Sequence, residues 1–250
     1  MAERRRLLIL GGTGEAVDLA AAAVVRFADG LEVITSRAGV TRDPAPVAGT
    51  ERRGGFGGID GMADYLREER IDLVIDATHP FAATMSEHAH AACLRAEVPR
   101  LQLLRPAWKP HPGDKWVEVP DTAAARALPR MARRVFLTTG RNGLDAFAAA
   151  EGLWFLVRLI EAPAEPLALP AHEIVTGRPP FALADERALI ERHHIDCLVS
   201  KNSGGEAGEA KLVAAREAGL RMVLIERPPP EPGDRVATVA EAVDWLSRRV

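Results

Sequence analysis

The sequence predicts an α/β protein of two doubly wound domains, each a parallel sheet covered by helices. Three observations lead to this prediction. Short apolar runs alternate with longer segments of helical periodicity along the 250 residues, a glycine-rich turn follows the first apolar run, and a proline-rich segment interrupts the alternation. Such alternation is typical of parallel strands connected by helices. We therefore expect one domain over residues 1–110 and a second over residues 111–250.

In the first half, the expected strands are apolar on nearly every residue, as buried parallel strands are. They cover Leu7–Leu10, Leu31–Ser36, Ile71–Ala77 and Pro99–Arg105. Between the strands, apolar residues recur on one helical face, for example at Val17, Ala21 and Val24. The expected helices cover Ala16–Ala28, Asp60–Glu69 and Ala83–Glu97.

The segment 105–114 contains three prolines and a glycine, which interrupt helices and strands alike. The alternation then restarts, and so many strands favour two sheets over one. The expected strands of the second half cover Arg134–Gly140, Trp154–Ile160, His172–Gly177, Ile195–Ser200 and Leu220–Glu226. The expected helices cover Asn142–Ala150, Leu183–His193, Glu206–Ala218 and Thr238–Arg248.

Composition excludes several classes of function. A net charge of −3 does not fit a general nucleic-acid-binding protein. The two cysteines, Cys93 and Cys197, lie in apolar stretches and predict neither a disulfide framework nor a metal site. The first apolar run stops at Leu10, which is too short for a signal-peptide core or a membrane span. We expect a cytoplasmic monomer that binds neither nucleic acid nor membranes.

The first strand ends in a glycine-rich turn. In doubly wound folds, ligands bind at the carboxyl ends of the strands, where glycines let a pyrophosphate approach the free N–H groups of a helix. Gly12 and Gly14 match the G-x-G-x-x-G pattern of dinucleotide-binding proteins, but Val17 replaces its third glycine. A tight turn without a ligand is the alternative. The predicted cofactor-binding residues here are Gly11, Gly12, Thr13, Gly14 and Glu15.

The second strand ends in Thr35, Ser36 and Arg37. An NAD-binding domain usually carries an acidic residue here to hold the ribose 2′-hydroxyl. A hydroxyl and a guanidinium suit a 2′-phosphate instead, which favours NADPH bound through Ser36 and Arg37. The alternative is that Arg37 is a solvated surface charge. In that case Arg42 and the Arg52–Arg53 pair are the next candidates.

The third strand is followed by the segment ATHPFA, residues 77–82. His79 could donate a proton or form a hydrogen bond to a ligand. Thr78 either contacts the cofactor or caps the next helix. The sequence leaves these two roles of Thr78 open.

Basic residues and glycines also follow strands of the second half. The segment TTGRNG supplies Arg141, and SKNSGG supplies a run from Lys201 to Gly205. Positive side chains and free N–H groups at one edge suit an anionic ligand, a polycarboxylate or a phosphate. Independent helix caps with solvated charges are an equally good interpretation.

Four segments together resemble the precorrin-6A reductase family of cobalamin biosynthesis. They are LILGGTGEA, DLVIDATHPFA, TTGRNG and LVSKNSGGEAGEAKLVAAREAGL, and the similarity covers nearly the whole chain in the same order. The resemblance implies two Rossmann-like domains with a tetrapyrrole in an inter-domain cleft. It also implies NADPH-dependent reduction of one double bond of precorrin-6A, which gives precorrin-6B.

The resemblance implies roles for the strand-end residues as well. In this interpretation the cofactor supplies the hydride, and the source of the proton stays open between His79, Lys201, a substrate carboxyl group and water. Thr78 joins the cofactor-binding residues. The residues expected to bind the acetate and propionate groups of the substrate are His79, Arg141, Lys201, Asn202, Ser203 and Gly204.

Three alternatives remain at this point. The substrate could carry cobalt, as in the anaerobic route. The chain could be a non-catalytic NADP(H)-binding regulatory protein, although no helix-turn-helix segment supports that hypothesis. It could also be a glycosyl- or methyltransferase on a similar fold. Oxidation of NADPH on addition of precorrin-6A separates the reductase from the other two classes.

Overall fold

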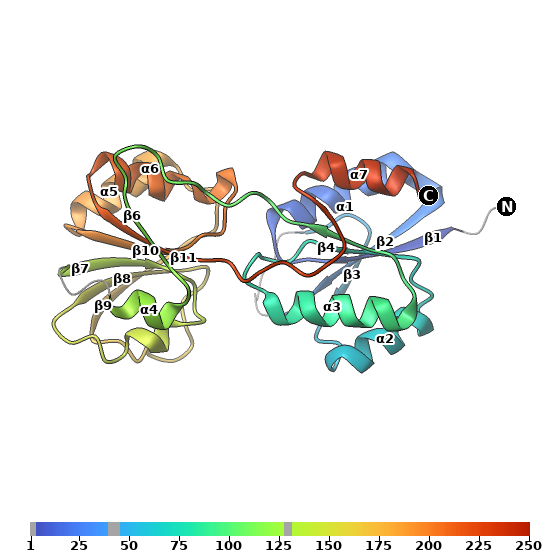
Figure 1. The fold of residues 1–250 in the computed structure, drawn as a ribbon, viewed down its shortest axis with the longest axis horizontal. Coiled ribbons are helices and arrows are strands. Elements are labelled where there is room, and N and C mark those ends of the chain that lie inside the picture. The colour runs from blue at the N-terminus through green and yellow to red at the C-terminus, as the bar shows by residue number, and fades with distance from the viewer. Residues whose placement is uncertain (1–3, 40–45, 128–131) are drawn as a thin grey trace. The chain divides into compact units, whose positions relative to one another are not determined.

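A computed structural model describes residues 4–39, 46–127 and 132–250. The chain divides into two compact units. Unit 1 consists of Met1–Arg105 together with Pro228–Val250, and unit 2 consists of Pro106–Arg227. Each unit holds a six-stranded parallel sheet (Figure 1). The predicted fold class, two doubly wound parallel-sheet domains, is therefore confirmed.

Unit 1 has helices on both faces of its sheet. Its strands are β1 (Arg5–Leu10), β2 (Leu31–Arg37), β3 (Thr50–Arg53), β4 (Leu73–Asp76), β5 (Arg100–Leu103) and β12 (Asp234–Val236), in the order β12-β5-β4-β1-β2-β3. One face carries α1 (Gly14–Phe27) and α7 (Val239–Ser247), and the other carries α2 (Gly58–Glu68) and α3 (Ala83–Ala96). Leu7 and Ile9 pack under the first pair of helices, whereas Leu8 and Leu10 pack under the second. This two-sided burial explains the unbroken apolar run of β1.

Unit 2 repeats the same plan. Its strands are β6 (Lys115–Val119), β7 (Arg134–Thr138), β8 (Trp154–Leu159), β9 (Ala171–Thr176), β10 (Cys197–Lys201) and β11 (Arg221–Ile225), in the order β6-β11-β10-β7-β8-β9. Helices α5 (Leu183–Arg192) and α6 (Ala210–Glu217) cover one face, where Phe136, Leu156 and Leu198 are buried. Helix α4 (Thr122–Ala127) lies on the other face (Figure 1).

The two sheets exchange their outermost strands. Strand β6 follows the first run of unit 1 in the chain but pairs with β11 of unit 2. Strand β12 follows unit 2 but pairs with β5 of unit 1, with Asp234 opposite Leu101. Helix α7 then buries Ala242, Trp245 and Leu246 in the core of unit 1. The structure thus differs from the predicted second domain over residues 111–250, because residues 228–250 complete the first sheet and its helical layer.

Local structure differs from the prediction at two kinds of place. The predicted helix Asn142–Ala150 is instead a short 3₁₀ helix, Leu144–Phe147, which buries its first and last residues. Such spacing of three residues suits the tighter helix. Strands β3, β6 and β12 were not predicted, because each lies at the edge of its sheet and contains polar, partly exposed residues.

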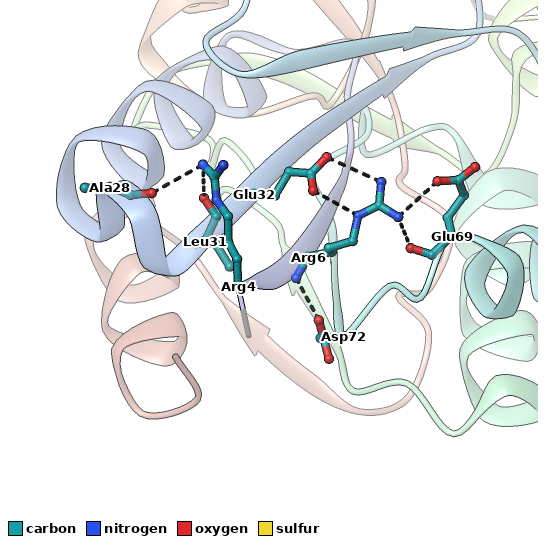
Figure 2. Close-up of polar contacts among 7 residues, drawn as sticks. All are labelled: Arg4, Arg6, Ala28, Leu31, Glu32, Glu69 and Asp72. Carbon is teal, nitrogen blue, oxygen red and sulfur yellow. Dashed lines mark hydrogen bonds and ion pairs between the residues drawn. The ribbon is translucent and has the colours of Figure 1, made fainter. Parts of the chain in front are cut away.

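Charged side chains form a hydrogen-bonded network at the amino ends of the strands of unit 1, which Figure 2 shows. The backbone N–H of Arg6 donates to Asp72 (2.7 Å), and the Arg6 guanidinium donates to Glu32 (3.1 Å) and Glu69 (3.0 Å). Arg4 donates to the carbonyl oxygen of Leu31 (3.0 Å). These bonds tie β1 to β2 and to the segment after α2. The predicted ligand-binding residues of unit 1 lie at the opposite, carboxyl ends of the strands.

Candidate functional site

The glycine turn lies between β1 and α1, where the sequence predicted a pyrophosphate site. The Gly11 N–H donates to the Ser36 carbonyl oxygen (2.8 Å), and a Cβ on Gly11 would come within 3.0 Å of the Thr35 methyl group. Gly12 has a φ of +117°, which favours glycine. A Cβ on Gly12 or Gly14 would meet no atom of the described residues within 4 Å. The open space over the amino end of α1 fits a phosphate group held by backbone N–H groups.

Two polar side chains of this turn have structural partners. The Thr13 hydroxyl caps α1 by accepting from the Ala16 N–H (3.2 Å) and donates to the Ala77 carbonyl oxygen (2.7 Å). Its hydroxyl proton therefore joins the glycine turn to the segment after β4, and the predicted contact of Thr13 with a cofactor stays a prediction. Glu15 accepts from the guanidinium of Arg105 (2.9 Å). The backbone N–H groups of the turn are therefore its main candidates for binding an anion.

The end of β2 brings a hydroxyl and three arginines together. Ser36 is buried, and its Oγ accepts from Nη1 of Arg52 on the neighbouring strand β3 (3.0 Å). The Arg37 side chain is only 10% exposed and lies 3.7 Å from Glu51, so it is an ion-paired group and not a solvated charge. Arg53 donates to the same carboxylate (2.9 Å). Arg42 lies outside the described residues.

A buried carboxylate that the sequence analysis missed organises the segment after β4. Asp76 is 1% exposed, and one of its oxygens accepts from both the N–H (3.1 Å) and the hydroxyl (2.7 Å) of Thr78. Thr78 therefore does not cap α3, whose N-cap residue is Ala82. His79 accepts from the Phe81 N–H through Nδ1 (3.2 Å), which places the proton of a neutral ring on Nε2. The sequence did offer a signal for this residue, because Asp76 is an acidic residue at the end of the otherwise apolar run LVID.

In unit 2, the two predicted cations follow adjacent strands. Arg141 is exposed in the turn after β7, and Lys201 is the last residue of β10, which pairs with β7. Lys201 is partly buried, and this burial lowers the pKa of its ammonium group. Both residues therefore lie toward the carboxyl edge of the second sheet, as expected.

The segment after Lys201 is built against the start of unit 2. The Asn202 side chain accepts from the Trp108 N–H (2.9 Å) and donates to the Trp108 carbonyl oxygen (3.2 Å). Gly204 has a φ of +64°, and a Cβ there would lie 1.9 Å from the Pro106 carbonyl oxygen. Ser203 is partly buried beside them. Asn202 and Gly204 thus have structural tasks, and their contact with a substrate stays a prediction.

Arg227 and Trp108 hold this segment, and sequence reasoning found neither. Arg227 donates to the carbonyl oxygens of Asn202 (2.7 Å) and Ser203 (2.7 Å). The Trp108 indole N–H donates to the Gly205 carbonyl oxygen (3.0 Å). No local pattern could have indicated these contacts, because the partners of Trp108 lie 94 and 97 residues further along the chain.

Other kinds of site find little support. Burial raises the pKa of the Cys93 and Cys197 thiols to about 12, so neither is a thiolate nucleophile at neutral pH. Within residues 4–39, 46–127 and 132–250, no cluster of three or more His, Cys, Asp or Glu side chains could hold a metal ion. In that part of the chain, no helix has the length and apolar composition needed to cross a bilayer.

Comparisons with known proteins agree over almost the whole chain. The model of a family described as Precorrin-6x reductase CbiJ/CobK matches residues 6–247. The curated Precorrin-6A reductase of Rhodococcus erythropolis is 48% identical over 244 residues, which cover 96% of this chain and 97% of that one. The Cobalt-precorrin-6A reductase of Priestia megaterium is 28% identical over 198 residues, which cover 75% and 77% of the two chains. A solved structure of CobK precorrin-6A reductase superposes with a TM-score of 0.92 at 43% identity, covering 98% and 96%.

Proposed function

The chain belongs to the precorrin-6x reductase family and is an oxidoreductase of cobalamin biosynthesis, and on this premise we propose that it reduces precorrin-6A to precorrin-6B with NADPH. The observation that carries the proposal is the family match over residues 6–247. The chemistry of the strand ends supports it, because unit 1 offers donors for phosphates and unit 2 offers cations for carboxylates.

Unit 1 is the proposed NADPH-binding unit. The first-turn N–H groups of α1 would hold the pyrophosphate, since a helix leaves these donors unpaired and its dipole favours an anion. Gly12 and Gly14 leave the approach to these donors open. Ser36, Arg37 and Arg52 would lie at the adenosine ribose end. Thr78 would contact the cofactor from the segment after β4, at the orientation that Asp76 sets.

Unit 2 is the proposed substrate-binding unit. Precorrins carry several acetate and propionate groups, and carboxylates bind most strongly to charged donors. Lys201 and Arg141 supply those charges from adjacent strands. Ser203 and the backbone of Asn202 and Gly204 extend the same segment, which Arg227 and Trp108 fix in place.

The proposed reaction adds a hydride to one carbon of a conjugated double bond and a proton to its neighbour. The nicotinamide supplies the hydride when it is bound, and the oxidised cofactor leaves as NADP⁺. The protein contributes position and charge, so that no residue has to form a covalent intermediate. His79 and Lys201 are the proposed proton donors, because each can carry an acidic proton when protonated, and they lie three residues after β4 and at the end of β10.

The cobalt-free substrate is favoured over the cobalt-containing one. The Rhodococcus Precorrin-6A reductase is 48% identical to the chain, whereas the Priestia Cobalt-precorrin-6A reductase is 28% identical and matches a smaller share of it.

The proposal is tested by mixing the protein with NADPH and either precorrin-6A or cobalt-precorrin-6A. We expect NADPH absorbance to fall with precorrin-6A, and mass spectrometry to find a product that has gained one hydride and one proton. Faster turnover of the cobalt-containing compound would identify the alternative substrate. Binding of NADPH without consumption in either mixture would contradict the enzyme assignment and favour a regulatory protein.

A further inference from the structure

We propose that Arg52 is the residue that reads the 2′-phosphate of NADPH and sets the preference for NADPH over NADH. This inference rests on the proposed function, since it assigns a role within the cofactor site of unit 1. The sequence placed that role on Ser36 and Arg37. In the structure, Arg52 differs from Arg37 and Arg53 in its ion pairing and in the groups that hold its guanidinium, and it projects from the same face of the sheet as Ser36.

Three arginines lie at the carboxyl ends of β2 and β3, and two of them share one carboxylate. Arg37 lies 3.7 Å and Arg53 2.9 Å from Glu51. These two cations lower the pKa of Glu51, with the hydrogen bond from Arg53 as the largest cause. Glu51 therefore stays ionised and offsets part of their charge. In the described part of the chain Arg52 forms no ion pair, and its charge remains available to an anion.

Arg52 also lies on the same side of the sheet as Ser36. The two residues are opposite each other in the parallel pairing of β2 and β3, and Arg37 is opposite Arg53. Because side chains alternate along a strand, Ser36 and Arg52 project from one face and Arg37 from the other. Nη1 of Arg52 donates to Ser36 Oγ (3.0 Å), which leaves the hydroxyl proton of Ser36 available for donation.

The Arg52 guanidinium is held in place before any ligand arrives. Its two terminal nitrogens donate to the carbonyl oxygens of Gly54 (2.7 Å) and Gly55 (2.8 Å). Its central carbon lies 3.8 Å from the centre of the Phe56 ring and 4.8 Å from that of Tyr65. Stacking and fixed hydrogen bonds reduce the side-chain entropy that binding would otherwise cost. A guanidinium fixed beside a hydroxyl is suited to a phosphate monoester.

The test compares the affinities for NADPH and NADH of the wild type, Arg52→Ala, Arg52→Lys and Arg53→Ala, measured by fluorescence titration. Loss of one charge-assisted contact weakens binding by roughly 10- to 100-fold. We expect Arg52→Ala to lose about that much NADPH affinity while NADH affinity changes less than about twofold. Arg52→Lys keeps the charge and should recover part of the loss. Arg53→Ala is the matched control, because its side chain pairs with Glu51, and it should behave as the wild type.

A second titration keeps the test independent of how well the alanine variant folds. The wild type and Arg52→Lys are titrated with adenosine 2′,5′-bisphosphate and with adenosine 5′-monophosphate, and we expect the first compound to bind more tightly and to lose more affinity in the variant. An NADPH preference in the wild type that survives Arg52→Ala would overturn the role of Arg52 alone. A wild type that does not distinguish NADPH from NADH would overturn the proposed cofactor, and the role of Arg52 with it.

Discussion

The two units share a strand order but differ in the helix that follows β1 in unit 1 and β7, the strand at the same place in the order, in unit 2. In unit 1, β1 leads through the glycine turn into α1, a helix of 14 residues. In unit 2, β7 leads into a turn and a 3₁₀ helix of four residues, Leu144–Phe147. Only the longer helix presents a full set of aligned N–H groups and a substantial dipole. In the proposed assignment, this topology therefore serves a phosphate site in unit 1 only, and the cations at the strand ends of unit 2 serve the substrate.

A second contrast concerns a strand arginine in each unit, Arg52 of β3 and Arg158 of β8, that stacks on an aromatic ring. Arg52 lies 3.8 Å from the centre of the Phe56 ring, and Arg158 of β8 lies 4.0 Å from that of Phe181. Arg158 pairs with Glu186, whose side chain is fully buried, whereas no carboxylate of the described residues pairs with Arg52. Unit 2 pairs its arginine with a buried carboxylate, whereas the arginine of unit 1 is the one that we propose binds a ligand. The contrast teaches that a fold repeated in one chain need not repeat its binding site.

The largest effect should come from Arg158→Ala. Removing one partner of a buried ion pair leaves the other charge without compensation, and Glu186 already has one oxygen without a hydrogen-bond partner in the described residues. We expect the free energy of unfolding to fall by about 3–5 kcal/mol, measured by chemical denaturation. Replacing both partners, as Arg158→Met with Glu186→Leu, should restore most of it. If Arg158→Ala lowers the free energy of unfolding no more than Arg52→Ala does, the two arginines do not differ in the way that the contrast requires.

Two glycine substitutions should separate a structural turn from a binding turn. Gly204→Ala forces a Cβ against the Pro106 carbonyl oxygen at a positive φ, and we expect it to cost about 3 kcal/mol of unfolding free energy. Gly14→Val has room in the fold, so the unfolding midpoint should hardly move. NADPH affinity should nevertheless fall by about 100-fold or more, which is roughly 2.7 kcal/mol. A well-folded Gly14→Val variant that binds NADPH normally would place the pyrophosphate elsewhere.

A smaller effect distinguishes the two cations of unit 2 through pH. Burial holds the pKa of Lys201 below its ordinary value of 10.5, so this ammonium loses its proton at a lower pH than a free lysine. If Lys201 binds a substrate carboxylate, the KM for precorrin-6A should rise as the pH increases through that lowered pKa. Lys201→Met and Arg141→Ala should each raise the KM about tenfold at neutral pH. The rise of KM at alkaline pH should remain in Arg141→Ala and disappear in Lys201→Met. If the rise persists in Lys201→Met, a group other than Lys201 causes it.

The lowered pKa of Lys201 also affects the stability of the folded protein. Because the folded-state pKa of Lys201 is lowered, the folded protein pays for a partly buried charge at every pH below that pKa. The cost disappears as the pH rises through the lowered pKa toward the unfolded value. At neutral pH, Lys201→Met should therefore be at least as stable as the wild type.

Burial on two faces decided how much of the fold could be predicted. Strands β1, β4, β7 and β10 lie inside their sheets and are visible as apolar runs. Strands such as β12 lie at an edge, are short and polar, and are defined by a partner far away in the sequence. The exchange of edge strands depends on those pairings, and so it could not be predicted from local pattern.

The candidate site divides in the same way. Residues that directly follow apolar runs, such as Gly12, Ser36 and Lys201, were found by their position after a strand. Arg52 was only a reserve candidate, because its place beside Ser36 follows from the pairing of β2 with β3. The bonds of Asn202 to Trp108 join residues that lie 94 positions apart. Sequence position therefore identified the candidate residues, whereas tertiary contacts decided which of their side chains already have a partner in the fold.

The exchanged strands have a consequence for the order in which the protein can be completed during translation. Strand β12 is synthesised after every residue of unit 2, so the sheet of unit 1 must wait for its sixth strand until the ribosome has made the whole of unit 2. During that interval β5 presents an unpaired edge, which is a surface prone to intermolecular strand addition. Unit 2, whose residues run without interruption from Pro106 to Arg227, has all its strands before that moment. The nascent chain can thus finish its second unit before its first, in the reverse of the order in which their first strands emerge.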